Sequence, residues 1–482
     1  MSQNKNMVKN RMGKLSFFEK FGYSLGDVAS NLYFQTFILF ITYFYTDVFG
    51  LPAAAVGTLF LVTRIFDAVN DPMMGMIADR TDTKMGKFRP YLLWFAIPFG
   101  IVGVLTFTTP DFSPVGKLIY AYVTYILLIV LYTVVNVPYS ALMGVLTDDP
   151  KERTVISSFR MIGAFVAGII VQFSVMFLVR KLGAGNEQKG WQFTMAILSG
   201  FAVVLLLIAF ASTKERVEPI RGRKTSMRQD LKDLFKNYAW ICIAVVSVLQ
   251  LIMIVVRNGC IMYYFKYYVG DVDFGFLGNS YTLDFNTAAS AFMVIGTLIS
   301  IVGAIYVGWI AKKFDKRNTY LWLLVIFIFS SVIFYFLGPD DYILMIISQF
   351  AVSLVLGSLG VLQWSIFPDT ADYSEWKTGR RATGLIMAAS LFSIKLGLAL
   401  GGAILGWLLA LFGFEPNVVQ DPQTLIGIRL IISVFPAIFG IFALIVMWFY
   451  PLNNEILNKV EAGLQKCRQN KEECDEEFVG KN

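Results

Sequence analysis

Long, continuous apolar runs constrain this chain more than any other feature. Hydrophobic residues make up 56% of its 482 residues, and charged residues make up only 16%. A membrane-spanning helix needs about 20 mostly apolar residues, whereas soluble domains carry about 25% charged residues. The composition therefore excludes the soluble, disordered and disulfide-rich secreted classes. A transmembrane β-barrel does not fit either, because its strands alternate apolar and polar residues.

Twelve apolar runs are long enough to cross a membrane. We predict spans at residues 22–46, 56–78, 90–108, 118–147, 154–180, 191–212, 238–269, 287–311, 319–337, 342–366, 385–412 and 425–450. Of the 41 Lys and Arg residues, 31 fall in the tails and loops of one side, and only Lys117, Arg180, Lys181 and Lys189 fall in the opposite loops. The positive-inside rule then places both termini in the cytoplasm. We expect a multi-pass protein of the inner membrane, and the net charge of +7 therefore does not indicate a nucleic-acid partner.

The residues needed for most enzyme chemistry are missing. The chain has no histidine, which excludes imidazole bases, histidine metal ligands and Ser-His or Cys-His nucleophile pairs. Its four cysteines lack metal-ligand spacing, and no nucleotide-binding loop of the G-x-x-x-x-G-K-[ST] type occurs. We therefore expect neither an enzyme nor a cofactor.

A weak internal repeat indicates two similar halves. Gly75-Met-Ile-Ala-Asp79-Arg80 follows the second span, and Gly308-Trp-Ile-Ala-Lys312-Lys313 follows the eighth. Two parallel six-helix halves fit an all-α membrane protein of the major facilitator fold, with the substrate near the midplane. The predicted parts are a cytoplasmic tail, a six-helix bundle, a central cytoplasmic loop, a second bundle and a second tail, at 1–21, 22–212, 213–237, 238–450 and 451–482.

The second span carries an unusual group of polar residues. Steps of three and four place Arg64, Asp67, Asn70 and Asp71 on one helical face. Ionisable groups inside a span are costly, so they indicate a function. Two carboxylates four residues apart favour a cation between them, which predicts a site for Na⁺, Li⁺ or H⁺ at Asp67, Asn70 and Asp71. The alternative is that Arg64 neutralises Asp67 as a buried ion pair.

Other polar residues inside the spans are candidates for binding sites. Asp27 lies in the first span and adds to the polar group of the second span. Asn136 precedes Pro138, which we expect to break the fourth span and free backbone carbonyls that line a cavity; the alternative is a simple kink satisfied by a neighbour. Arg160 could donate to substrate hydroxyls or form an ion pair within the bundle. Lys395 could reach the carboxylates of the first half or extend to a membrane interface.

Aromatic and amide side chains add further candidates. Gln363 can bridge hydroxyl groups, and the indole of Trp364 can pack on the C–H face of a sugar. Phe34 follows Asp27 by two helical turns, and Tyr139 lies one turn from Asn136.

Charged residues next to the spans predict a gate on the cytoplasmic side. The stretch 368–384, expected to be a loop, mixes acids and bases densely. Ion pairs there would break when the inner face opens; the alternative is a solvated loop. The predicted gating residues are Arg64, Asp79, Arg80, Arg89, Asp369, Asp372, Glu375, Arg380 and Arg381.

Three motifs carry a resemblance to a known family. They are Tyr45-Thr46-Asp47-Val48-Phe49-Gly50, the second span from Arg64 to Gly75 followed by Gly86-Lys87-Phe88-Arg89-Pro90, and Asp369-Thr-Ala-Asp372-Tyr373-Ser-Glu375-Trp376. From about Gly22 to Leu452 the chain resembles the glycoside–pentoside–hexuronide:cation symporters, of which melibiose permease is the best-known member.

The resemblance implies a role for each matching residue. Asp67 and Asp71 would be cation ligands, and metal ligands if the ion is Na⁺. Asp27 and Arg160 would hold sugar hydroxyls, and Lys395 would help to couple the two sites. Asn136 stands where melibiose permease has an aspartate, which leaves the choice between Na⁺ and H⁺ open.

We therefore expect a monomeric symporter that imports a glycoside, uronide or oligosaccharide by alternating access. A lipid or lysophospholipid transporter of the same superfamily is the alternative. A sensor or scaffold would need a large extra domain, which the sequence does not contain.

Overall fold

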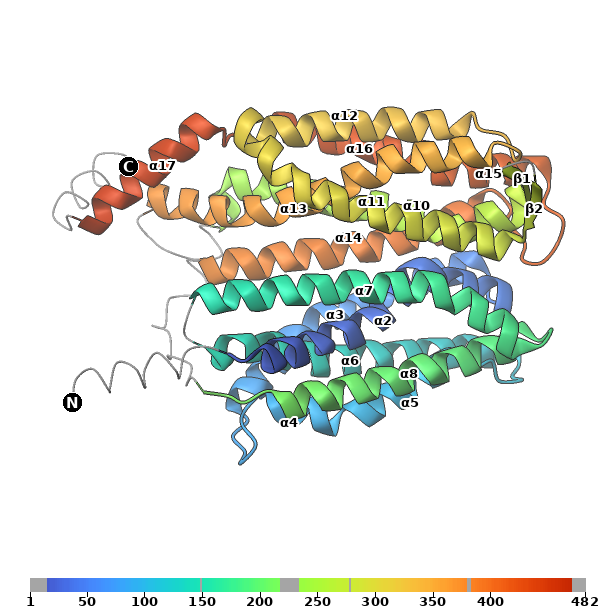
Figure 1. Cartoon of the computed structure of the whole chain (residues 1–482), viewed down its shortest axis with the longest axis horizontal. Coiled ribbons are helices and arrows are strands. Elements are labelled where there is room, and N and C mark those ends of the chain that lie inside the picture. Colours follow the sequence, from blue (N-terminus) through green and yellow to red (C-terminus); the bar gives the residue numbers. More distant parts are fainter. Residues whose placement is uncertain (1–14, 148–149, 217–233, 277–278, 379–382, 470–482) are drawn as a thin grey trace. The chain divides into compact units, whose positions relative to one another are not determined.

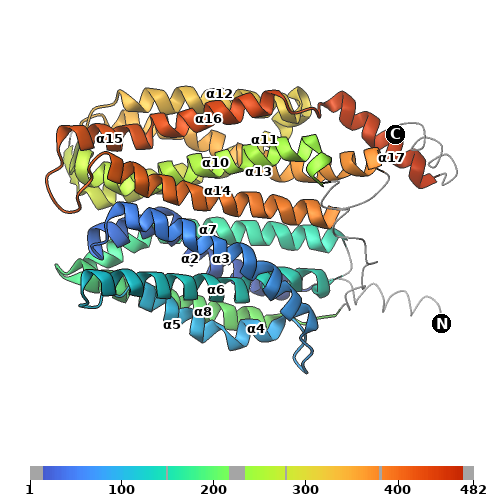
Figure 2. The same cartoon turned by 180° about the vertical axis from the view of Figure 1, so that it is seen from behind.

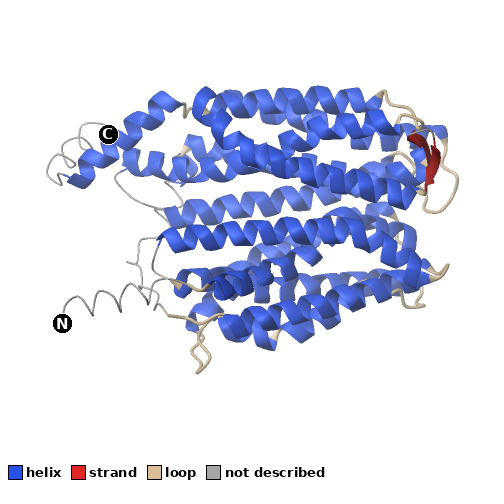
Figure 3. Ribbon diagram, viewed as in Figure 1, coloured by secondary structure: helices blue, strands red, loops and turns tan. Residues whose placement is uncertain are grey.

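The described part of the chain is almost entirely helical. The computed structural model describes residues 15–147, 150–216, 234–276, 279–378 and 383–469 (Figure 3). Its contacts divide the chain into two compact units. Unit 1 lies within Met1–Gly222 with Ala289–Val294 and Glu415–Val418, and unit 2 lies within Arg223–Ala288, Ile295–Phe414 and Val419–Asn482.

Unit 1 is built from the helices of the first six predicted spans. They are α2 (Phe17–Tyr43) with a π-helical extension η1 (Phe44–Val48), α3 (Ala53–Arg80), α4 (Arg89–Trp94), α5 (Ala96–Thr106), α6 (Pro114–Leu146), α7 (Pro150–Gly183) and α8 (Glu187–Ser212). α2 packs against α7 and α8, α5 packs against α6 and α8, and α3 packs against α6 (Figures 1 and 2). The fully buried Trp191 of α8 lies against the rings of Phe44 and Phe107, with centroids 5.6 and 5.5 Å away.

Unit 2 contains the helices of the remaining spans and one hairpin. Its elements are α10 (Tyr238–Tyr263) with η2 (Tyr264–Val269), β1 (Val272–Phe276), β2 (Asn279–Leu283), α11 (Phe285–Phe314), α12 (Lys316–Tyr335), α13 (Tyr342–Thr378), α14 (Thr383–Leu411), α15 (Pro422–Ile432), α16 (Val434–Trp448) and α17 (Asn454–Gln469). The strands are antiparallel, with Val272 opposite Leu283. α10 packs against α14 and α16, and α12 packs against α13 and α16.

Nine helices in the described part of the chain are long and apolar enough to cross a membrane. The predicted spans outside this set are 22–46, 56–78 and 90–108. The first two coincide with α2 and α3, which carry the polar residues of the candidate sites, and the third is divided into α4 and α5 at Phe95. The prediction of an all-α membrane protein is confirmed.

The first helix of each unit ends in the same local structure. α2 passes into η1 and then Gly50, and α10 passes into η2 and then Gly270, with φ of +85° and +72° at the two glycines. Glycine adopts this left-handed conformation without steric cost. In each π-helix a backbone N–H reaches the carbonyl five residues earlier, from Phe49 to Phe44 and from Gly270 to Phe265, both at 2.8 Å. This correspondence supports a repeat between the two halves.

Two local predictions are wrong, and both concern proline. The stretch 368–384 does not begin as a loop, because α13 continues through Pro368 to Thr378. Similarly, α6 is continuous across Pro138. Proline is tolerated inside such helices when neighbouring groups satisfy the carbonyls of the weakened turn. In α13, Lys316 donates to the carbonyl of Ser365, three residues before Pro368, at 3.2 Å.

One carboxylate anchors the connection between α3 and α4. Glu215, just after α8, accepts hydrogen bonds from the backbone N–H groups of Lys87, Phe88 and Arg89 at 2.9, 2.8 and 3.0 Å. Gly86 has a φ of +110°, and a Cβ there would lie 2.5 Å from the Glu215 carboxylate. Only glycine therefore permits this close approach.

The residues around Glu215 tie several helix ends of unit 1 together. Arg89 donates to the carbonyl of Phe210 at 2.9 Å and lies over its ring. Arg216 forms an ion pair with Glu19 at the start of α2, and its N–H donates to Val145 of α6 at 2.8 Å. Burial alone would raise the pKa of Glu19, but the hydrogen bonds from Arg216 and Ser16 hold that pKa below its ordinary value.

Removing the charge of Glu215 should release the 82–89 connection. We expect Glu215→Gln to speed tryptic cleavage at Lys84 or Lys87 by about 5- to 30-fold, since a loss of one or two kcal/mol changes the open population by that factor. The measurement is limited proteolysis of the purified protein with mass spectrometry of the fragments. Glu455→Gln, which removes only the exposed Glu455–Lys459 pair, is the control. Equal cleavage rates in both variants would contradict the role given to Glu215.

Candidate functional site

Two predicted cation ligands converge on one hydroxyl group. The Thr133 hydroxyl of α6 donates to Asp71 Oδ1 at 2.9 Å and lies 3.3 Å from Asp67 Oδ1. Thr133 and Asp67 are buried, and Asp71 is partly buried. Since α3 and α6 pack together, the (i, i+4) spacing of the two aspartates directs both carboxylates towards the same side chain. The structure thus brings three oxygen-bearing side chains together at this junction.

Asn70 lies between the two aspartates on α3. Its amide nitrogen is buried and has no hydrogen-bond partner among the described residues, so this amide is free to turn towards a ligand. The side chain of Arg64 lies outside the described residues, and the predicted Arg64–Asp67 ion pair therefore stays a prediction. No three His, Cys, Asp or Glu side chains gather in a metal-binding group anywhere in the described ranges.

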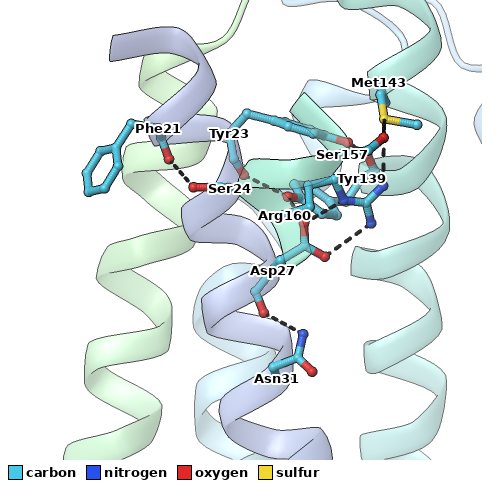
Figure 4. Close-up of polar contacts among 9 residues, drawn as sticks. All are labelled: Phe21, Tyr23, Ser24, Asp27, Asn31, Tyr139, Met143, Ser157 and Arg160. Carbon is cyan, nitrogen blue, oxygen red and sulfur yellow. Dashed lines mark hydrogen bonds and ion pairs between the residues drawn. The ribbon is translucent and has the colours of Figure 1, made fainter. Parts of the chain in front are cut away.

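Asp27 and Arg160 form the second polar cluster of unit 1. Arg160 Nε donates to Asp27 Oδ2 at 2.5 Å, and Arg160 Nη2 donates to Oδ1 at 3.1 Å (Figure 4). This two-point contact joins α7 to α2, and bidentate pairs of this kind are both strong and directional. Of the two predicted alternatives for Arg160, the structure shows the ion pair within the bundle. The side chains remain 23% and 13% exposed, so the pair is still accessible to a ligand.

The other predicted residues of unit 1 differ in their contacts. The hydroxyl oxygen of Tyr139 lies 2.7 Å from Asp27 Oδ2 (Figure 4), and the Tyr139 side chain is fully buried. Asn136 is half-buried, and its amide donates to the carbonyl of Tyr132 in its own helix at 3.0 Å. Phe34 is half-buried on α2. Tyr139 is thus joined directly to the Asp27–Arg160 pair.

The predicted sugar contacts of unit 2 do not share one face. Gln363 is buried, and its amide nitrogen has no hydrogen-bond partner in the described part of the chain. Trp364 is 45% exposed, with its ring edge towards Phe367. Consecutive helical residues point about 100° apart, which explains the difference. Lys395 is half-buried on α14.

The predicted gating residues have separate surroundings. Asp369 pairs with Lys316 at 2.6 Å, Arg89 donates to backbone carbonyls, and Arg80 is exposed. Asp372 and Glu375 are half-buried in the last turns of α13. The side chain of Asp79 and the whole of Arg380 and Arg381 lie outside the described residues.

Sequence reasoning missed three partners. Thr133 lies three residues before Asn136, Tyr23 lies one turn before Asp27, and Lys316 begins α12. The only available signal was helical spacing from residues already singled out, which is weak for a threonine or tyrosine in an apolar run.

Comparisons with known proteins show that this chain is similar to transporters. Residues 22–454 match the family described as MFS/sugar transport protein. The chain is 38% identical to the "Inner membrane symporter YicJ" of Escherichia coli, over 96% of this chain and 98% of that protein. It is 34% identical to the "Isoprimeverose transporter" of Lactiplantibacillus pentosus, over 89% of this chain and 88% of that protein.

Solved structures agree at the level of the fold. A D-xylose-proton symporter superposes with a TM-score of 0.59 at 15% identity, over 90% of this chain and 97% of that one. A bacterial homologue of human drug peptide transporters gives a TM-score of 0.64 at 13% identity, over 94% and 100%. The chain therefore belongs to the MFS/sugar transport family, as the resemblance to the glycoside–pentoside–hexuronide:cation symporters predicted, and is a membrane transporter rather than an enzyme.

Proposed function

We propose that this chain is a symporter that couples the import of a glycoside-type sugar to a singly charged cation by alternating access. The observation that carries the proposal is the junction of α3 and α6, where the Thr133 hydroxyl lies within hydrogen-bond distance of both Asp67 and Asp71. The full-length similarity to proteins named as a symporter and as an isoprimeverose transporter supports a sugar as the substrate. The lipid-transporter alternative is not favoured for the same reason.

The charges at this junction explain why a cation would bind. Asp67 and Asp71 repel each other when both are ionised, and this repulsion is strong away from water. A bound Na⁺, Li⁺ or H⁺ would offset it. The Thr133 hydroxyl donates to a carboxylate in the structure, and its oxygen would become a ligand once the proton turns away. Asn136 adds no charge, so Asp67 and Asp71 would set the preference for the ion.

The sugar would bind at Asp27 and Arg160. A carboxylate beside a guanidinium offers an acceptor and several donors, and this combination can form hydrogen bonds with sugar hydroxyl groups. Gln363, Trp364 and Lys395 stay predicted sugar contacts. Phe34 and Asn136 would line the same sugar site from unit 1.

Helix α6 offers a physical connection between the two sites. It carries Thr133 at the cation site and Tyr139 at the sugar site, six residues or about 9 Å apart along the axis. A change in the hydrogen bonds of Thr133 could therefore reach Asp27 through the same helix. This is the element that both ligands would bias, as coupling between two sites requires.

The orientation follows from the distribution of basic residues. We infer that the protein is a monomer in the inner membrane. Both termini would lie in the cytoplasm, since 31 of the 41 Lys and Arg residues fall on that side. The Lys316–Asp369 ion pair would then lie at the cytoplasmic side and act as one part of the inner gate.

Reconstituted protein should accumulate sugar only with a cation gradient. We expect uptake of labelled xylosides, glucosides or glucuronides into proteoliposomes under a Na⁺ or a proton gradient, each imposed separately. Asp71→Asn should abolish accumulation, because one of the two carboxylates is lost. Asp340→Asn, at an exposed position, should leave it unchanged. Uptake that needs neither gradient, or that survives Asp71→Asn, would contradict the proposal.

Thr133 provides a finer test of the cation site. We expect Thr133→Val to raise the half-saturating cation concentration for sugar uptake about tenfold, since the shape is kept and one oxygen ligand is lost. Thr133→Ser keeps the hydroxyl and should change the value by less than about threefold. Similar values in the valine and serine variants would show that the hydroxyl is not a ligand.

A further inference from the structure

Two buried tyrosines, Tyr23 and Tyr139, form a pair beside the Asp27–Arg160 cluster. Their rings stack with centroids 4.6 Å apart. Tyr23 Oη donates to the backbone carbonyl of Tyr139 at 2.8 Å, and Tyr139 Oη lies 2.7 Å from both the carbonyl of Tyr23 and Asp27 Oδ2 (Figure 4). Each tyrosine is only 1% exposed. Neither can touch a ligand without leaving its place.

The tyrosine pair is fitted closely to its surroundings. The Arg160 guanidinium carbon lies 5.2 Å from the Tyr139 ring centre and 5.8 Å from that of Tyr23. A Cβ at Gly26 would lie 2.4 Å from the Tyr139 ring, so any larger residue would displace it. Gly26 of α2 therefore leaves the space that the Tyr139 ring of α6 occupies.

The two oxygens of Asp27 have different partners as a result. Oδ2 has two, Arg160 Nε and the Tyr139 hydroxyl. Oδ1 accepts only from Arg160 Nη2 in the described part of the chain. Arg160 Nη1 has Met143 Sδ at 3.9 Å, a weak acceptor. The capacity left for a ligand is therefore an acceptor site on Oδ1 and donors on Nη1.

Tyr139 has one hydroxyl proton and two acceptors within reach. A carboxylate is the stronger acceptor, because charge-assisted hydrogen bonds are about twice as strong as neutral ones. The hydroxyl therefore favours Asp27 over the carbonyl of Tyr23.

We propose that Tyr139 is a positioning residue for the sugar site: its hydroxyl occupies Asp27 Oδ2 and so orients Oδ1 and the free edge of Arg160 towards the sugar. The proposal rests on the proposed function, since it assigns how the same site reads a hydroxyl group. In this role Tyr139 does not contact the sugar directly and acts on it through Asp27.

Sugar uptake by two matched variants tests this role. Tyr139→Phe removes the hydroxyl and keeps the ring, and we expect the KM for sugar to rise about tenfold while the maximal rate and the half-saturating cation concentration change by less than about twofold. Tyr33→Phe removes another buried hydroxyl of α2, which donates to Ser199 at 2.8 Å and does not contact Asp27, so it should leave KM unchanged. Equal effects of the two variants, or no rise in KM for Tyr139→Phe, would overturn the proposal.

A second measurement does not depend on transport. Melting temperatures of the purified protein are compared for Tyr139→Phe in the native and in the Asp27→Asn background. If the hydroxyl acts on the carboxylate, the loss caused by Tyr139→Phe should shrink to about half or less once the charge is gone. An equal loss in both backgrounds would overturn the proposal. If the unmodified protein takes up no sugar, the proposed function fails, and this comparison alone still decides whether Tyr139 holds Asp27.

Discussion

Two hydroxyl groups of a single helix, α6, lie within hydrogen-bond distance of three carboxylates of unit 1. Thr133 reaches Asp71 and Asp67, and Tyr139 reaches Asp27. An acid placed within a membrane-spanning bundle is costly unless it is paired or hydrogen-bonded, so these contacts constrain where α2 and α3 can lie against α6. The same contacts define the two candidate sites. The packing of unit 1 and its chemistry therefore depend on the same few hydrogen bonds.

Unit 2 contains a buried charge, Arg257, that is held by neutral groups. Arg257 is fully buried, donates to the carbonyl of Ile432 and to Gln349, and lies over the ring of Phe334. Ile432 ends α15, where α15 and α16 are interrupted at Ser433. A cation held by neutral groups at a helix interruption stabilises the fold, because the guanidinium satisfies a carbonyl that the helix no longer uses. Acids gather in the clusters of unit 1, whereas this buried charge of unit 2 is structural.

The sequence predicted most of the helices well, because nine of the described helices are long and apolar enough to be unambiguous. It also predicted that Asp67 and Asp71 lie on one helical face, since the spacing of the two residues on one helix is a local property. Thr133 and Tyr23 could not be predicted in the same way, because their roles depend on which helices pack together. The continuation of α13 through Pro368 was missed for a similar reason: the contact of Lys316 with the weakened turn comes from a different helix.

We propose that the cation and sugar sites are coupled through α6. The most direct test is the equilibrium affinity of the purified protein for a transported sugar, measured by calorimetry with and without the coupling cation. Coupling predicts that the cation lowers the sugar Kd by about 5- to 150-fold and that the sugar lowers the cation Kd by the same factor. A sugar Kd that is unchanged by Na⁺, by Li⁺ and by pH would contradict the account.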